Sequence, residues 1–180
     1  MPTPPTPGTY AVDPLHSTVS FVARHLVGAK VRGHFKEFSG TITIGEDPEQ
    51  SSVNADVVVA SVETNQEQRD AHLRSGDFFE VEAYPNLTLR STGLTKKSDE
   101  SYVLHADLTV RGVTKPVDFD LEYLGTGPGM APGSEVAAFE ASTEIDRRDF
   151  GVNFGGALDS GGLIVGNKVR IELDVEAHKQ

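Results

Sequence analysis

The feature that most constrains this chain is an alternation of apolar and polar residues with a period of two, which covers most of its length. In residues 169–177, VRIELDVEA, every odd-numbered residue is apolar and every even-numbered residue is charged. Val, Ile, Thr and aromatic residues are frequent in such segments, and Gly, Pro and Asp bound them, which is typical of β-strands. Strands buried on both faces would be apolar throughout. The pattern therefore predicts an all-β protein whose strands have one core face and one solvent face.

About eight amphipathic segments of this kind follow one another, mostly with short turns between them. Such a chain folds into an antiparallel barrel or a sandwich. We favour an extended eight-stranded antiparallel barrel, because long strands tilt and close naturally and closure removes exposed edges. The length of 180 residues suits one domain, which we place at residues 9–178. Residues 1–8, MPTPPTPG, are predicted to be a disordered Pro-rich tail.

Residues 61–85 interrupt the strand pattern and predict one short helical segment at about 65–80. Thr64 and Glu67 have the spacing of a capping box, and Asn65 is an alternative N-cap. Residues 66–74 lack Gly and Pro, and Gly76 would tolerate a left-handed stop. A short helix followed by Phe78 and Phe79 could plug one end of a barrel.

Composition excludes several classes of function. The formal net charge of −11 opposes binding to nucleic acid and, more weakly, to anionic membrane surfaces. The absence of Cys excludes disulfides, thiolate metal sites and Cys nucleophiles. The N-terminus lacks a secretion signal and no apolar run approaches the roughly 20 residues of a membrane span. We therefore expect a soluble cytoplasmic protein with no integral membrane segment. The oligomeric state stays open, with a homodimer as one candidate.

The predicted inward faces combine large and very small residues, which favours a cavity over a packed interior. Small residues lie on the same predicted strand faces as bulky ones, and the chain has no Trp and only two Met. The small positions are Ala23, Gly33, Ala55, Ala106 and Ala141. The alternative is that they relieve crowding where strands meet. An apolar cavity of this kind suits a hydrocarbon chain, because each buried methylene contributes about 0.8 kcal/mol.

Several motifs, in order along residues 10–177, carry a resemblance to a known family. They are YAVDPLHS (10–17), Phe21 with His25, VRGHF (31–35), FSG (38–40), RDAHLRSGDFF (69–79), YP (84–85), DLTVRGVTKPV (107–117) and RRDFGV (147–152). In these motifs the chain resembles the YceI-like family of lipocalin-like barrels, described as polyisoprenoid- or lipid-binding. The resemblance implies an elongated apolar pocket for a long amphiphile, with no chemistry required. Many members of the family are periplasmic, whereas no signal peptide is visible here.

We expect ten apolar residues and two histidines to bind the ligand. They are Phe21, His25, Phe35, Phe38, His72, Leu73, Phe78, Phe79, Leu104, Phe119, Phe139 and Phe150. His25 could donate to a ligand head group or be an ordinary core histidine. His72 could bind a head group or, with Arg69 and Asp70, tie the helix to the barrel rim.

We expect no catalytic residue, no metal site and no resident cofactor other than a bound isoprenoid lipid or quinone-like ligand. The six histidines lack the spacing of metal ligands, although a site assembled from distant strands stays open. Asp13, His16 and Ser17 are close in sequence, but no nucleophile elbow supports a catalytic set.

The leading hypothesis is a non-catalytic protein that transports or sequesters a long-chain amphiphile, such as a polyisoprenoid or isoprenoid quinone. One alternative is a barrel enzyme that acts on a lipid-like substrate with His25 or His72 as acid and base. Another is a stress-related interaction scaffold, which would need an exposed apolar patch.

Overall fold

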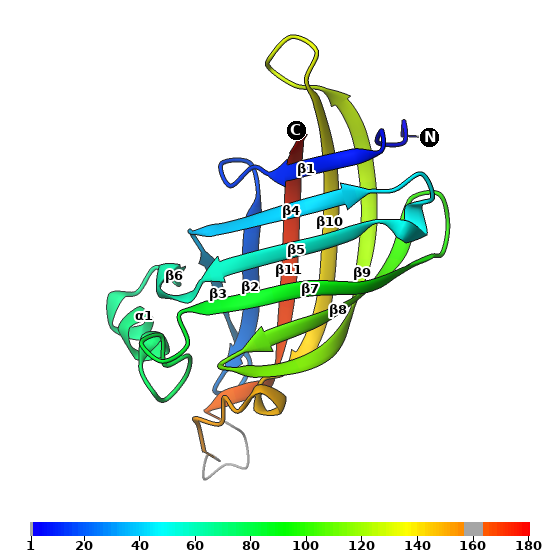
Figure 1. Cartoon of the computed structure of the whole chain (residues 1–180). Coiled ribbons are helices and arrows are strands. Elements are labelled where there is room, and N and C mark those ends of the chain that lie inside the picture. The colour runs from blue at the N-terminus through cyan, green and yellow to red at the C-terminus, as the bar shows by residue number, and fades with distance from the viewer. Residues whose placement is uncertain (1, 157–163) are drawn as a thin grey trace.

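Eight long strands close an antiparallel β-barrel in the computed structural model, which describes residues 2–156 and 164–180. The order around the barrel is β1-β4-β5-β7-β8-β9-β10-β11, and pairing of β1 with β11 completes the circle (Figure 1). The strands are β1 (Gly8–Val12), β4 (Phe38–Ile44), β5 (Ser52–Val58), β7 (Asn86–Lys96), β8 (Ser101–Val110), β9 (Val113–Pro128), β10 (Glu135–Asp146) and β11 (Val165–Lys179). The predicted all-β barrel is confirmed.

Three further strands extend the sheet from one edge of β11. β2 (Thr18–His25) pairs with residues 165–174 of β11, whereas β1 pairs with residues 177–179 of the same strand. β1 and β2 therefore follow one another along one edge of β11, with a corner at residues 13–17 between them. β3 (Ala29–Phe35) pairs with β2, and the two-residue strand β6 (Val62–Glu63) pairs with β3.

Strand β8 shows why the sequence pattern produces a barrel. All five of its even-numbered residues are buried, and the residues between them are partly exposed. The buried face comprises Tyr102, Leu104, Ala106, Leu108 and Val110. Since successive side chains of a strand point to opposite faces, this alternation fixes the register and turns the apolar set toward the barrel interior.

One of the small inward residues is required by a close contact. A Cβ atom on Gly33 would lie 2.3 Å from Cζ of Phe21, on the neighbouring strand β2. The glycine thus leaves room for the Phe21 ring beside β3, and this position fits the crowding alternative considered above. Ala55 and Ala141, by contrast, face open space inside the barrel.

The single α-helix among the described residues, α1 (Glu67–Arg74), begins and ends differently from the sequence prediction. Gln66 is the N-cap, and its side chain accepts a hydrogen bond from the backbone N–H of Arg69. Thr64 and Asn65 are not the cap, because Thr64 instead donates its backbone N–H to Asp70 Oδ1 at 2.9 Å. The C-cap is Ser75 in an extended conformation, so Gly76 does not supply a left-handed stop. Three short 3-10 helices, η1 (Pro48–Gln50), η2 (Val59–Ser61) and η3 (Arg147–Phe150), complete the described elements.

Candidate ligand-binding cavity

The barrel encloses an elongated cavity of about 900 Å³. This volume lies near the upper end of the roughly 300–1,000 Å³ that small-molecule sites occupy. Its wall is made by the inward residues of β4, β5 and β7–β11, together with Val19 and Phe21 of β2 and Phe35 of β3. The barrel interior is therefore hollow along much of its length.

The cavity wall is mostly apolar. Aliphatic and aromatic side chains contributed at alternate positions line it, among them Ile42, Val53, Leu89, Phe119 and Leu173. Three charged residues also line it, namely Glu46, Lys96 and Asp99, and all three are exposed. Lys96 Nζ pairs with Asp99 Oδ1 at 2.9 Å. They lie in or beside the β4–β5 and β7–β8 connections, so charge gathers at one end of the cavity.

The Pro-rich N-terminal tail crosses that charged end. Pro2, Thr3, Pro4, Pro5 and Pro7 all line the cavity. The chain's first described residues thus act as part of the wall, although residues 2–6 belong to no strand or helix.

Hydrogen bonds hold this tail to the barrel. The hydroxyl of Tyr10 donates to the carbonyl oxygen of Thr6 at 2.8 Å, and the Thr6 backbone N–H donates to Glu135 Oε1 at 3.0 Å. The Tyr123 hydroxyl donates to the Thr3 carbonyl oxygen, and Lys179 Nζ donates to the Thr6 hydroxyl. The tail is therefore anchored at Thr3 and Thr6, with prolines on either side of these anchors.

The pKa shifts of Tyr10 and Glu135 are consistent with the hydrogen bonds that anchor the tail. Burial raises the pKa of the Tyr10 hydroxyl, and its hydrogen bond to the Glu135 carboxylate raises that pKa further. The same bond holds the pKa of Glu135 below its ordinary value. At neutral pH the tyrosine is thus a proton donor and the glutamate an acceptor, which is the arrangement that the tail contacts require.

The opposite end of the cavity is closed by an aromatic cluster. Phe78 and Phe150 are buried and pack against Leu108 and Val110, which line the cavity. Phe79 meets the lining residue Phe35 edge to face, with ring centroids 5.9 Å apart. Figure 1 shows α1 beside this end and the N-terminus at the other end of β4, β5 and β7. The segment that follows α1 therefore packs behind the lining residues at this end, which we call the floor of the cavity.

The structure divides the twelve ligand-binding residues expected from the sequence into two equal groups. Six of them line the cavity: Phe21, Phe35, Phe38, Leu104, Phe119 and Phe139. The other six do not line it: His25, His72, Leu73, Phe78, Phe79 and Phe150. Within the second group, Leu73, Phe78, Phe79 and Phe150 pack in the clusters beneath the floor.

The two histidines of the second group lie outside the cavity. His25 is exposed at the end of β2. His72 Nε2 lies 2.7 Å from Asp77 Oδ2, and its ring meets Phe78 and Phe154 edge to face. Their binding of a ligand head group stays a prediction, as does a role of His72, with Arg69 and Asp70, in tying the helix to the barrel rim.

Sequence reasoning missed the tail and much of the aliphatic wall. The tail has no apolar periodicity, so nothing in residues 2–7 indicated a place beside a cavity. The wall residues Ile42, Val53 and Leu87 could have been found from the sequence, because each alternates in phase with the inward-facing residues of its strand.

In the described part of the chain, no group of side chains with metal-binding geometry lines the cavity.

Comparison with known proteins agrees with this architecture. The model of the YceI-like domain matches residues 10–177, nearly the whole chain. The chain belongs to the YceI-like family. A UPF0312 protein of Staphylococcus aureus is 34% identical over 169 residues, which cover 93% of this chain and 95% of the relative. A UPF0312 protein of Staphylococcus epidermidis is 35% identical over 166 residues, which cover 91% and 94%.

Solved structures of other YceI-like barrels superpose well on this one. The YCEI protein of Campylobacter jejuni has a TM-score of 0.74 at 28% identity, over 87% of this chain and 90% of that one. BcnA of Burkholderia cenocepacia has a TM-score of 0.80 at 23% identity, over 92% and 98%. A domain from Saccharophagus degradans described as polyisoprenoid-binding has a TM-score of 0.71 at 16% identity, over 95% and 98%. The last two comparisons, at 23% and 16% identity, show a shared fold and nothing further.

Among the helices of the described residues, none is both long and apolar enough to cross a bilayer. The one α-helix, α1, has eight residues and a mostly polar sequence.

Proposed function

We propose that this YceI-like protein binds one long-chain amphiphile, of the polyisoprenoid or isoprenoid-quinone type, inside its barrel and carries or sequesters it. The observation that carries the proposal is the cavity of about 900 Å³, whose wall in the described part of the chain is mostly apolar and has its charged residues at one end. An apolar chain would lie along the barrel and a polar head would remain at the charged end.

The energetics favour a long ligand. Each methylene moved from water into such a wall contributes about 0.8 kcal/mol, so one five-carbon isoprene unit contributes up to roughly 4 kcal/mol before ordering costs. Contacts at the rim are exposed to water, where an ion pair contributes about 0–1 kcal/mol. Chain length would therefore determine affinity, and the rim would determine orientation.

The likeness to a polyisoprenoid-binding domain supports this class of ligand, since the two barrels share their fold over nearly their full lengths. A binding role without turnover fits the wall, because catalysis needs convergent polar groups near the bound molecule. Neither His25 nor His72, the acid–base candidates of the enzyme alternative, lines the cavity.

A titration with polyprenyl alcohols of increasing length tests the proposal. We expect the dissociation constant to fall by at least about tenfold for each added isoprene unit until the cavity is full, because tenfold corresponds to only about 1.4 kcal/mol. The affinity should then stop increasing. An affinity that does not depend on chain length would contradict the proposal.

Removal of the tail should accelerate ligand exchange. A variant that lacks residues 2–7 loses the five lining residues of the tail, and it keeps Tyr10 and the strand pairing of β1. We expect faster dissociation of a bound polyprenyl alcohol in stopped-flow experiments and a nearly unchanged melting temperature. The matched control is Thr92→Ala, an exposed position outside the cavity wall, which should leave the rate unchanged. An unaltered rate in the tail deletion would show that ligand leaves by another path.

A further inference from the structure

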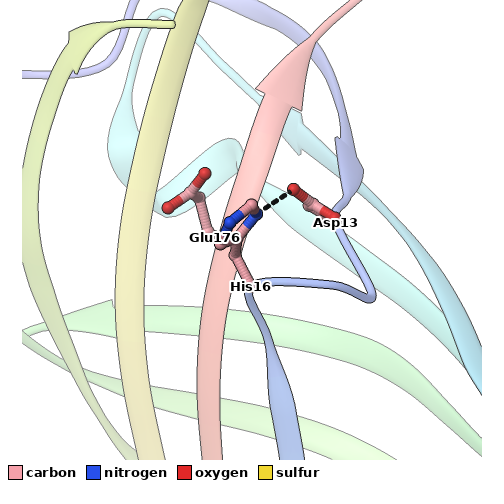
Figure 2. Close-up of side chains that lie close together, drawn as sticks. All are labelled: Asp13, His16 and Glu176. Atoms are coloured by element: carbon pink, nitrogen blue, oxygen red, sulfur yellow. Dashed lines mark hydrogen bonds and ion pairs between the residues drawn. The ribbon is translucent and has the colours of Figure 1, made fainter. Parts of the chain in front are cut away.

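The corner between β1 and β2 brings four potential metal ligands together on the outside of the barrel. Asp13 and His16 lie in the corner, and Glu176 and His178 lie two residues apart on β11. Because side chains two apart on a strand share a face, both β11 residues project toward the corner. Figure 2 shows Asp13, His16 and Glu176 close together at this seam, with the His16–Asp13 contact dashed. The cluster is separate from the cavity, since none of the four residues lines it.

The four side chains approach closely. Asp13 Oδ2 lies 2.7 Å from Nδ1 of His16 and 3.2 Å from Nε2 of His178. His178 Nε2 is also 3.2 Å from Oε1 of Glu176. The ligand atoms of Asp13, His16 and Glu176 all lie within 4.8 Å of one another. One carboxylate oxygen thus bridges two imidazoles, with a second carboxylate beside them.

Backbone contacts hold the cluster in place. The Asp13 backbone N–H donates to the carbonyl oxygen of Glu176 at 2.8 Å. Asp13 Oδ1 accepts from the backbone N–H of Leu15 at 2.9 Å, which leaves Oδ2 toward the histidines. The Ser17 hydroxyl accepts from the Glu176 backbone N–H at 3.0 Å. In the described part of the chain, neither carboxylate pairs with a Lys or Arg that would neutralise it.

We propose that Asp13, His16, Glu176 and His178 bind one divalent first-row transition cation, of which Zn²⁺ is the best match. Zinc accepts imidazole nitrogen and carboxylate oxygen in a tetrahedron with bonds of about 2.0–2.2 Å, so neighbouring ligand atoms lie about 3.3–3.6 Å apart. Two of the six edges of such a tetrahedron, the 3.2 Å separations of His178 from Asp13 and Glu176, are close to that value, and the ligand atoms of Asp13, His16 and Glu176 lie within 4.8 Å of one another. The 2.7 Å contact between Asp13 Oδ2 and His16 Nδ1 must lengthen slightly. The His16 side chain is 64% exposed and so is free to move.

The proposed site would hold together the seam at which β1 closes the barrel. The cation would link the corner that follows β1 to β11, its partner strand. Since metal that binds only the folded state stabilises it by mass action, Zn²⁺ should raise the melting temperature. Binding requires neutral imidazoles, because only an unprotonated ring nitrogen can bind the cation.

Isothermal titration of the tag-free protein with Zn²⁺ alone tests the site. We expect saturable binding of one ion per chain, and an affinity lowered by about tenfold or more in His16→Ala and in His178→Ala, since even outer contacts of metal sites contribute about 10–100-fold. The matched control is His105→Ala, which removes a histidine that lies 2.7 Å from Asp118 elsewhere on the barrel surface. That variant should bind Zn²⁺ as the unmodified chain does.

A second readout separates a lost ligand from a lost fold. In the unmodified chain, histidine ring NMR signals of His16 and His178 should shift on addition of Zn²⁺, while that of His105 should not. No saturable binding, or binding that both single substitutions leave unchanged, would overturn the proposal. Neither outcome bears on the cavity, because polyprenyl binding is measured without metal.

Discussion

Substitution of Ala141 by Trp should remove most of the barrel's affinity for a polyprenyl alcohol and leave the fold in place. Ala141 lies on β10 and lines the cavity, opposite Leu121 of β9 and Leu173 of β11. An indole at this point would occupy the space of several ligand carbons. Displacement of three methylenes costs about 2.4 kcal/mol, which corresponds to roughly 50-fold weaker binding.

The matched control for this substitution is the preceding residue of the same strand. Glu140 is exposed on the outer face of β10, so Glu140→Trp adds the same ring outside the barrel. Fluorescence titration with one polyprenyl alcohol should show near-normal affinity for this control. Equal affinities in the two Trp variants would mean that the ligand does not occupy the cavity.

Substitution of Phe150 by Ala should produce the largest loss of stability. Phe150 is 2% exposed and belongs to the cluster that closes the floor, where it packs with Phe78, Leu108 and Val152. Truncation of a buried Phe to Ala typically costs about 3–5 kcal/mol, through lost transfer free energy and the hole left behind. Because domains of this size have a free energy of unfolding of only about 5–15 kcal/mol, urea denaturation should show a clearly lower midpoint.

Met130→Ala is the control for that experiment. Met130 is fully exposed in the loop between β9 and β10, so its truncation should leave the urea midpoint nearly unchanged. A Phe150→Ala variant as stable as the Met130→Ala variant would show that the floor cluster contributes little to the fold.

The alternation of apolar residues was sufficient to predict the strands and their inward faces, because the period of two fixes both; the choice of a barrel over a sandwich rested on strand length and on closure of exposed edges. Leu104 and Phe119 illustrate this, since each lines the cavity as its strand phase predicted. His25 has the same phase as Val19 and Phe21, which line the cavity, yet it is exposed. It lies at the last residue of β2, beyond the end of the enclosed wall. The face of a strand to which a residue points follows from the local sequence. Whether that residue is enclosed by the barrel depends on where its part of the strand lies in the sheet.

Features formed by segments that lie far apart in the sequence left no comparable pattern by which they could be predicted. The tail is positioned by Tyr123 and Glu135, more than 100 residues away along the chain. The Asp13 and His16 corner was visible as two nearby residues, but its approach to Glu176 and His178 depends on the pairing of β1 with β11. The helix was predicted from local chemistry, and its N-cap was misplaced because Thr64 has a stronger partner in Asp70.

The most direct test of the account is native mass spectrometry of the protein purified under non-denaturing conditions, followed by organic extraction of the same sample. We expect a population heavier than the 19.3 kDa chain by the mass of one long-chain amphiphile. Extraction should release that molecule, and the Ala141→Trp variant should lack it. Recovery of the bare chain alone, with no uptake of added polyprenyl alcohols, would contradict the claim that the cavity holds a lipid.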